Sequence, residues 1–511
     1  MSNALSETNA VRRFVLDPAE VDPDGVALID APTGAETTRG QLAEGVAAAA
    51  GALAALGIQR EQRVMMMMAD RPSFLEVFYG AMSIGAVPVP VSTMLVTKDY
   101  RFLLEDSRAT ACIVSDVFAG EVLPATEDQP WLEHVVVQGA AAASGLHYET
   151  LRDAASTISI FPADGEDIAF WLYTSGTTGF PKGALHRHVD MSFLTDNYGA
   201  GILEMGPEDR CYMVPKLFFA YGLGINYFAL GTGGTHILFD GRPTVEAIVD
   251  HVARHKPTMF WGVPTFMAQL VAAGVPDGLF ADTRIGVTGG EPLPSDVWRR
   301  CKEELGLTVL DSIGSTELAH IYIANRLDRQ HPGSQGWVVD GFEVEIRDDE
   351  GNVVPDGEPG QLYVAGESVT PGYWRRTDRN RQAFHGRFFA TGDTFVRNDD
   401  ESYSYLGRGD DMIKSGGIWV SPTEVESAVM EVEGVVLAAV VGKADDDGLT
   451  KPKAFVVLEP EVTPDDAMAG KIQDHVKATQ AKFKYPRWVE FVDELPQTAT
   501  GKVKRHLLRD T

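Results

Sequence analysis

The sequence predicts an α/β fold in which a large N-terminal domain, made of α/β subdomains and a β-rich subdomain, precedes a small α+β C-terminal domain. Three observations lead to this prediction. The chain has 511 residues, which is too many for one compact core. Short apolar runs typical of strands alternate with helical segments along most of its length. The pattern then changes near residue 342 and again near residue 408.

The alternation is clearest in the first part of the chain. The run RVMMMMAD (63–70) is typical of a buried strand and is followed by a helical segment over 73–86, and a further strand is predicted over 111–116. A methionine-rich binding surface is an alternative for Met65–Met68, but a buried strand is favoured. The alanine-rich run from Gly45 to Gly57 is too short to span a membrane, so we expect a packed helix ending at Gly57.

A β-rich subdomain is predicted over about 340–407. Its sequence consists of short alternating strands separated by turns at 349–351 and 355–357. Turns of this composition join neighbouring antiparallel strands. We therefore expect hairpins there, in contrast to the alternation of strands and helices earlier in the chain.

The domain boundary is predicted at the segment YLGRGDDMIKSGG (405–417). Glycines and charged residues here separate the β-rich part from a segment with its own pattern of helix, two strands and helix. We assign 1–407 to the N-terminal domain, 408–411 to a hinge and 412–511 to the C-terminal domain.

Composition and charge favour a cytoplasmic protein. The 44 Lys and Arg residues and 73 Asp and Glu residues give a net charge of −29, which disfavours a nucleic-acid partner. Cys112, Cys211 and Cys301 are widely separated and lack metal-ligand spacing, so we expect reduced thiols. The first residues contain no apolar signal-peptide core, so neither export nor membrane binding is expected.

The clearest local motif is WLYTSGTTGFPKGALH (171–186). An apolar strand leads into a loop whose glycines let backbone N–H groups turn toward one point, while hydroxyls and a lysine supply donors and positive charge. A plain turn is the alternative, but the combination after a buried strand favours polyphosphate binding. No Gly-Lys-Ser/Thr follows, which excludes a P-loop NTPase. The candidate phosphate-binding residues are Thr174, Ser175, Gly176, Thr177, Thr178, Gly179 and Lys182.

This loop resembles the signature loop of the adenylate-forming superfamily, which includes acyl- and aryl-CoA synthetases, peptide-synthetase adenylation domains and firefly luciferase. The resemblance covers nearly the whole chain, and it implies an enzyme that uses ATP to adenylate a carboxylic acid. In that family the loop binds the pyrophosphate of ATP. The other matching motifs, in the family's order, are VTGGEPLP (287–294), LDSIGSTELAHI (310–321), FATGDTFVR (389–397), YLGRGDDMIKSGG (405–417) and LPQTATGKVKR (495–505).

The resemblance assigns nucleotide contacts residue by residue. Asp393 would accept both ribose hydroxyls, Arg408 would contact ribose or phosphate, and Thr316 would contact a phosphate. The strand–Gly–Gly segment would lie along the adenine. Taken alone, the strand–Gly–Gly segment is a common feature, Glu317 would be a solvated surface charge, and Asp393 would be an aspartate in a Gly-Asp turn. The other residues assigned to the nucleotide are Gly289, Gly290, Glu291, Pro292, Asp311, Ser312, Ile313 and Gly314.

The resemblance also implies a catalytic set and a mobile small domain. Glu317 would hold Mg²⁺, while Lys182 and Lys502 would neutralise the phosphates and the carboxylate that attacks them. Asp410 falls on the hinge about which the small domain would swing between adenylation and thioester formation. The residues that would admit the pantetheine arm of coenzyme A are Ser415, Gly416 and Gly417.

The segment KLFFAYGLGINYFAL (216–230) resembles the benzoate-CoA ligase branch of the superfamily. There, small residues would leave a flat slot with ring-shaped walls, and Lys216 would lie at its mouth and attract the carboxylate. An aromatic-rich core segment, with a core histidine, is the alternative. Gly416 departs from the apolar residue expected in this branch, which bears on coenzyme A access. The predicted acyl-pocket residues are Ala220, Tyr221, Gly314, His320 and Ile321.

The predicted function is therefore that of a benzoate-CoA ligase, which converts ATP, a small aromatic acid and coenzyme A to aryl-CoA, AMP and diphosphate, with Mg²⁺. Three alternatives stay open: a ligase for another aryl or medium-chain acid, an adenylating enzyme that loads a separate carrier protein, and a non-catalytic sensor. The sequence leaves the oligomeric state open, with a homodimer as one option.

Overall fold

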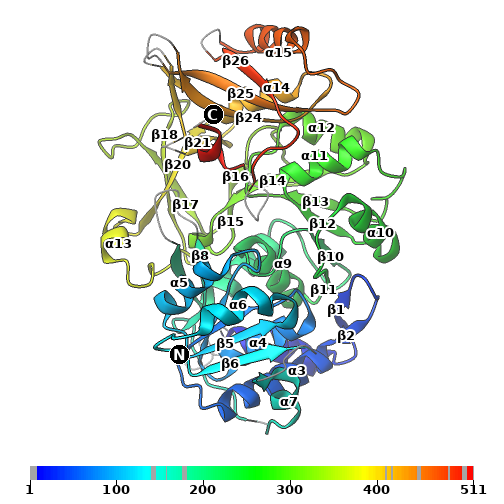
Figure 1. Cartoon of the computed structure of the whole chain (residues 1–511), viewed down its shortest axis with the longest axis vertical. Coiled ribbons are helices and arrows are strands. Elements are labelled where there is room, and N and C mark those ends of the chain that lie inside the picture. Colours follow the sequence, from blue (N-terminus) through cyan, green and yellow to red (C-terminus); the bar gives the residue numbers. More distant parts are fainter. Residues whose placement is uncertain are drawn as a thin grey trace.

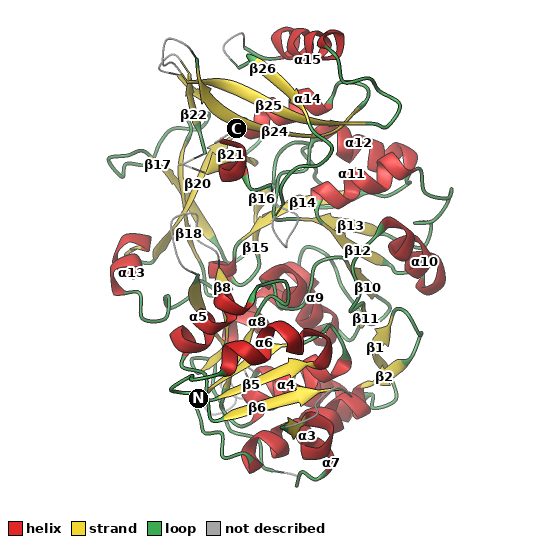
Figure 2. Ribbon diagram, viewed as in Figure 1, coloured by secondary structure: helices red, strands yellow, loops and turns green. Residues whose placement is uncertain are grey.

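The computed structural model describes residues 9–139, 145–156, 158–174, 181–408, 411–415, 418–445, 450–481, 484–497 and 503–509. Figure 1 shows a large body formed by most of the chain and, at the top of the view, a small unit formed by its C-terminal part. Coloured by secondary structure, the large body interleaves helices with strands, and strands dominate around β17, β18 and β20 (Figure 2). The predicted α/β fold class is confirmed.

The first sheet has five parallel strands in the order β4-β3-β5-β6-β7. Alternate residues of β3 face two different cores: Val64 and Met66 pack in the core of α3 and α4, whereas Met65 and Met67 pack in that of α5 and α6. Burial of both faces explains the uninterrupted apolar run, so the predicted buried strand is confirmed. The elements are β3 (Arg63–Met67), β4 (Val87–Pro90), β5 (Ala111–Ser115), β6 (His134–Gln138), β7 (Leu146–His147), α3 (Arg39–Ala55), α4 (Pro72–Ser83), α5 (Thr97–Ser107), α6 (Ala119–Thr126) and α7 (Tyr148–Asp153).

The second sheet has nine strands in the order β16-β15-β14-β13-β12-β10-β11-β1-β2. Its strands from β14 to β1 pair in parallel, and the outer strands pair antiparallel. Ligands of such sheets bind beyond the carboxyl ends of the parallel strands. The elements are β1 (Val26–Asp30), β2 (Glu36–Thr38), β10 (Arg210–Met213), β11 (Thr235–Leu238), β12 (Met259–Gly262), β13 (Ile285–Thr288), β14 (Val309–Gly314), β15 (Ile321–Ala324), β16 (Trp337–Val338), α9 (Ala220–Gly231), α10 (Val245–His255), α11 (Pro264–Ala273) and α12 (Ser295–Glu304).

An antiparallel pair of strands connects these two sheets in sequence. Strand β8 (Ile168–Thr174) pairs with β9 (Lys182–Arg187), and the predicted phosphate loop joins them. Helix α8 (His188–Leu194) follows directly. The short helical segments of the chain are η1 (Arg12–Leu16), α2 (Asp17–Val21), η2 (Asp116–Phe118), η3 (Thr195–Ala200) and η4 (Thr316–Leu318).

The β-rich subdomain is a five-stranded antiparallel sheet in the order β17-β18-β20-β19, with β21 paired to β20. Gly351 and Gly357 adopt positive φ in the two predicted turns, which confirms the turns, but both lie in the one connection between β17 and β18 and so do not join separate pairs of strands. The elements are β17 (Glu343–Arg347), β18 (Gly360–Ala365), β19 (Phe384–His385), β20 (Phe388–Arg397), β21 (Tyr403–Arg408) and α13 (Thr377–Ala383).

The C-terminal unit has its own core around the sheet β24-β25-β26. Arg505 holds the last helix to this unit through an ion pair of 2.7 Å with Glu426. The boundary at 408–411 stays a prediction, because residues 409 and 410 lie outside the described part. The elements are β22 (Ile413–Ser415), β23 (Ile418–Val420), β24 (Val435–Ala444), β25 (Thr450–Leu458), β26 (Trp488–Phe491), α14 (Pro422–Met430), α15 (Asp466–Thr479) and α16 (Arg505–Arg509).

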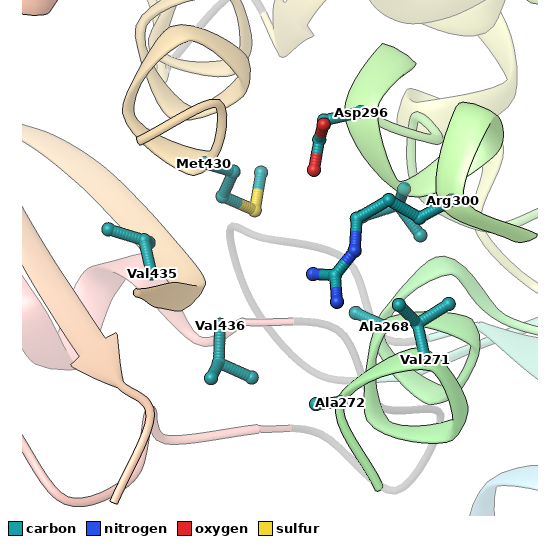
Figure 3. Close-up of a pocket in the computed structure, with 9 residues that line it drawn as sticks. Ala268, Val271, Ala272, Asp296, Arg300, Met430, Val435 and Val436 are labelled. Carbon is teal, nitrogen blue, oxygen red and sulfur yellow. The ribbon is translucent and has the colours of Figure 1, made fainter. Parts of the chain in front are cut away.

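The small unit rests on α11 and α12 of the large body. Leu437 of β24 packs against the large-body core that contains Val271 and Val297. Beside this contact, Arg300 faces Met430 across a crevice of about 10 Å³ (Figure 3), which is room for roughly one water molecule. No predicted site residue lines it, so the crevice belongs to the packing between the two parts. Among the described residues, no helix combines the length and apolar character needed to cross a membrane.

Candidate active site

The predicted phosphate-binding lysine lies at the start of β9. Lys182 pairs with Thr174 in the register of β8 and β9, so both ends of the loop are held by strand hydrogen bonds. The Lys182 ammonium lies 4.4 Å from the centre of the Tyr373 ring. Burial is the main cause that lowers the pKa of Lys182, and nearby Glu317 opposes it. Residues Ser175, Gly176, Thr177, Thr178 and Gly179 lie outside the described part, so their role stays a prediction.

Glu317, the predicted magnesium ligand, lies in η4 between β14 and β15. The Tyr373 hydroxyl donates a hydrogen bond of 2.7 Å to Glu317 Oε1. The backbone N–H of Thr370 donates to the Glu317 carbonyl oxygen at 2.8 Å. The side chain and the backbone of Glu317 are therefore both held from the β-rich subdomain.

A buried histidine supports the same turn from the other side. His186 Nε2 donates to the carbonyl oxygen of Thr316 at 2.8 Å, and its Nδ1 lies 3.3 Å from Asp190 Oδ2. Both side chains are fully buried. His186 lies four residues after Lys182 on β9. Its hydrogen bond to Thr316 therefore connects the phosphate hairpin to the turn that carries Glu317. Nothing in the sequence pattern singled out this residue.

Both carboxylate oxygens of Asp311 accept hydrogen bonds from the protein. Thr288 Oγ1 donates to its Oδ1 at 3.0 Å, and the N–H of Leu293 donates to its Oδ2 at 3.0 Å. Burial raises the pKa of this carboxyl group to about 7, although these hydrogen bonds oppose the shift. Asp311 thus holds both ends of the loop 289–292, the segment predicted to lie along the adenine.

Within that loop, Gly290 has a φ of +92° and Glu291 contacts the C-terminal segment. Glu291 Oε1 accepts the backbone N–H of Val503 at 3.2 Å, and its Oε2 accepts the Thr265 hydroxyl at 2.9 Å. The donated N–H belongs to the peptide bond that joins residues 502 and 503. This carboxylate therefore docks the segment adjoining Lys502 onto the large body.

The predicted ribose and phosphate residues are paired across two strands. Asp393 of β20 and Arg408 of β21 are register partners, and Arg408 Nε lies 3.1 Å from Asp393 Oδ1. The Arg408 side chain is 40 % exposed, compared with 9 % for Asp393. The pair places a carboxylate and a guanidinium side by side on the β-rich sheet, and their contacts to ribose and phosphate stay a prediction.

The predicted acyl-pocket residues come together where α9 meets the turn before β15. The ring centres of Tyr221 and His320 are 5.5 Å apart, and His320 Nε2 donates to the Tyr221 carbonyl oxygen at 3.0 Å. Burial lowers the pKa of His320 to about 3, so the ring is neutral. Its Nδ1 has no hydrogen-bond partner among the described residues.

At two positions beside His320 the structure leaves no room for any residue larger than glycine. A Cβ at Gly314 would lie 2.5 Å from the His320 carbonyl oxygen, and one at Gly224 would lie 2.0 Å from His320 Cδ2. The rings of Tyr198, Phe228 and Trp261 also surround His320. The sequence analysis missed these three rings and Gly224, because helix and strand positions far apart in the chain converge only in the fold. The other predicted pocket residues lie at the first position of α9 (Ala220) and of β15 (Ile321).

Lys216 is held by the protein. Its Nζ donates to the carbonyl oxygens of Phe239 and, at 2.8 Å, Gly241, and lies 3.7 Å from Asp70 Oδ2. These contacts tie the end of β10 to the segment after β11 and to the first sheet. Attraction of a substrate carboxylate by this ammonium stays a prediction.

The remaining predicted residues lie partly outside the described part of the chain. Lys502, Asp410, Gly416 and Gly417 lie outside the described residues, and Ser415 is described only through the backbone of β22. Ser312 Oγ donates to the Thr288 carbonyl oxygen at 2.6 Å, which fastens β14 to β13. The other predicted positions in this region are Gly289, Pro292, Ile313 and Thr316, all near the carboxyl ends of β13 and β14.

A divalent ion would need ligands besides the protein. No group of three or more His, Cys, Asp or Glu side chains suited to a metal occurs in the described part of the chain. Glu317 offers a hard carboxylate oxygen beside the predicted phosphate loop, which fits Mg²⁺ held mainly by phosphates and water.

Comparisons with known proteins agree over nearly the whole chain. The sequence profile described as AMP-binding enzyme matches residues 16–374, and the profile of the AMP-binding enzyme C-terminal domain matches 424–502. A benzoate–CoA ligase of Thauera aromatica is 40 % identical over 457 residues, covering 89 % of this chain and 86 % of that protein.

Two solved structures are also similar. The anthranilate CoA ligase AuaEII, solved with anthranoyl-AMP, superposes with a TM-score of 0.93 at 35 % identity, covering 99 % of this chain and 96 % of that one. A benzoate CoA ligase from Burkholderia xenovorans LB400 gives a TM-score of 0.90 at 37 % identity, covering 97 % and 99 %.

Proposed function

The chain belongs to the AMP-binding enzyme family, and on that premise we propose that it is an AMP-forming aryl-CoA ligase acting on benzoate-type acids. The relatives named for CoA ligation of benzoate and anthranilate support this proposal. The observation that carries it is the adjacency of two sites: Glu317 and His320 are three residues apart, on opposite sides of the turn through Ala319. One side faces the phosphate hairpin and the other the aromatic cluster.

In the first step, the acid's carboxylate attacks the α-phosphorus of ATP and diphosphate leaves. The obstacle is the approach of two anions, so cationic groups and N–H donors at the phosphates stabilise the transition state. Lys182 and Lys502 supply charge, and Asp393 orients the ribose. When bound, Mg²⁺ neutralises phosphate charge, with Glu317 as the protein residue that would hold it. Loss of one such contact costs on the order of 3 kcal/mol, or roughly a hundredfold in rate.

In the second step, the thiol of coenzyme A attacks the acyl carbon of the mixed anhydride, forming the thioester and releasing AMP. The thiol would need a path that opens when the segment adjoining Lys502 leaves Glu291. Rotation of the small unit about Asp410 would withdraw that segment and bring residues 415–417 to the pantetheine arm. Because ATP and coenzyme A are cytoplasmic metabolites, we expect the enzyme to work in the cytoplasm.

The neutral, buried His320 and the surrounding rings favour a flat, uncharged ring as the acyl group. Tyr221 Oη donates to the Val287 carbonyl oxygen at 3.1 Å, so the tyrosine presents ring carbon to the pocket. A straight alkyl chain would match these ring faces less well. The unpaired His320 Nδ1 is an acceptor, which makes hydroxybenzoates and aminobenzoates useful members of a substrate panel.

The test is AMP release that requires both ATP and coenzyme A, measured with benzoate, hydroxy-, amino- and halobenzoates, cinnamate, phenylacetate and hexanoate. We expect kcat/KM for the best benzoate to exceed that for hexanoate by at least a hundredfold. A preference for hexanoate or cinnamate would support the ligase reaction but contradict a pocket shaped for benzoate-type acids. AMP release at a rate that does not depend on coenzyme A would instead indicate a different acyl acceptor.

A further inference from the structure

Tyr373 lies between the two charged residues of the phosphate site, and no sequence motif assigned it a role. Its ring faces the Lys182 ammonium at 4.4 Å, and its hydroxyl donates to Glu317 at 2.7 Å. We propose that Tyr373 is a positioning residue that orients Glu317 toward the magnesium ion and holds Lys182 over its ring for the phosphates of ATP. This inference rests on the proposed function, in that both residues serve a magnesium–ATP substrate.

The hydroxyl determines which carboxylate oxygen faces the cation. The hydrogen bond occupies Glu317 Oε1 and restricts rotation of the carboxylate, which leaves Oε2 as the oxygen that would bind a cation. A phenol hydroxyl has one proton to donate, and here it is directed to the Glu317 carboxylate.

The ring holds the lysine without neutralising it. The face of an aromatic ring attracts an ammonium group through its quadrupole. Among the described residues, Lys182 has no carboxylate within ion-pair distance, so the ring is the contact that positions its charge. An acidic partner in the same place would hold the ammonium but would also cancel the charge that a polyphosphate needs.

Tyr373 is itself firmly placed. Its N–H donates to Asn380 Oδ1 at 2.9 Å, and Asn380 Nδ2 donates back to its carbonyl oxygen at 3.1 Å. Tyr373 also forms a bridge with Ala184 of β9, and the N–H of Trp374 donates to the Gly183 carbonyl oxygen at 2.8 Å. The tyrosine is thus attached to the strand that Lys182 begins, which fixes its position relative to Lys182.

A tyrosine elsewhere provides the matched control. Tyr148 Oη donates to Glu76 Oε2 at 2.8 Å, and Tyr148 is also buried. This pair joins α7, which lies at the bottom of the large body, to α4 (Figure 1). Tyr148→Phe removes the same kind of hydroxyl–carboxylate bond, so it reports the cost of that loss to the fold alone.

The experiment measures divalent-ion binding directly and turnover separately. Binding of Mn²⁺ in the presence of ATP and absence of acid is followed by electron paramagnetic resonance, and ATP affinity at saturating Mg²⁺ by calorimetry. We expect Tyr373→Phe to weaken Mn²⁺ binding about tenfold, as for loss of one hydrogen bond to a charged group, with ATP affinity changed less than threefold. Tyr373→Leu, which also removes the ring, is expected to weaken ATP binding about tenfold.

Acid-dependent exchange of diphosphate into ATP then gives the functional readout. For Tyr373→Phe we expect a higher Mg²⁺ requirement and near-normal kcat at saturating Mg²⁺, whereas Tyr148→Phe should change neither. Unchanged Mn²⁺ binding in Tyr373→Phe, or an equal change in Tyr148→Phe, would overturn the inference. If the wild-type protein binds Mn²⁺ and ATP but exchanges no diphosphate with any acid, the proposed function fails while the binding test of Tyr373 stands.

Discussion

Replacing Gly224 by alanine tests how tightly His320 is packed in the acyl site. A Cβ at Gly224 would lie 2.0 Å from His320 Cδ2 and 2.6 Å from its Nε2. Ordinary contact begins at 3.4 Å, so the ring must retreat by about 1.4 Å, the difference between 3.4 and 2.0 Å. That movement would break the hydrogen bond of His320 to the Tyr221 carbonyl oxygen.

Two effects of this change oppose each other. Alanine gains about 1 kcal/mol of helix propensity over glycine inside α9. Overpacking costs roughly 1–3 kcal/mol, and the lost hydrogen bond about 1 kcal/mol. The net expectation is a destabilisation of roughly 1–3 kcal/mol, because the propensity gain offsets only the hydrogen bond. Steric crowding therefore decides the sign.

Gly470 of α15 is the matched control, since a Cβ there would meet no atom within 4 Å. Gly470→Ala should stabilise the protein by up to about 1 kcal/mol. Thermal unfolding measures both variants, and initial rates measure the KM values for acid and ATP. We expect Gly224→Ala to raise the KM for acid about tenfold and to leave that for ATP unchanged. A Gly224→Ala protein as stable as Gly470→Ala, with normal acid selectivity, would refute the packing argument.

Three further predictions concern docking, the nucleotide and pH. Glu291→Ala should slow adenylation at least tenfold and spare thioester formation from supplied acyl-adenylate, because it releases the segment adjoining Lys502; equal loss in both half-reactions would contradict this. Asp393→Asn should weaken ATP binding by about tenfold, measured by calorimetry, because an amide accepts only through its single oxygen; unchanged affinity would remove the ribose assignment. Burial lowers the pKa of His236 to about 3, so the folded state disfavours the proton that the unfolded state binds below about pH 6.5. Stability should therefore fall between pH 6.5 and 5 by up to about 1.4 kcal/mol per unit from this group, and His236→Gln should reduce that slope in pH-dependent unfolding.

Much of the fold could be predicted because the pattern of neighbouring residues determines where strands and turns form. The uninterrupted apolar run of β3 predicted a buried strand, and the glycines near 351 and 357 predicted turns between antiparallel strands. These features depend on neighbours within a few residues, so the sequence alone contains the necessary information. The pairing order of the nine-stranded sheet could not be predicted in this way, since β10 and β11 lie between strands from distant parts of the chain.

The candidate site divides along the same line. Lys182, Glu317, Asp393 and Arg408 could be proposed from the sequence, because each lies in a motif that resembles the adenylate-forming superfamily, and their roles stay predictions. The sequence by itself thus indicated the kind of chemistry and the candidate residues for it. It could not indicate that Tyr373 would join two of them.

Only the tertiary structure decided how these residues are held. Tyr373 between Lys182 and Glu317, His186 beneath Thr316, and Glu291 against Val503 are contacts between segments 56 to 212 positions apart. The aromatic rings around His320 converge in the same manner. Such contacts depend on the packing of whole elements, which no local pattern encodes, whereas charge and hydrogen-bonding capacity belong to each side chain before the chain folds.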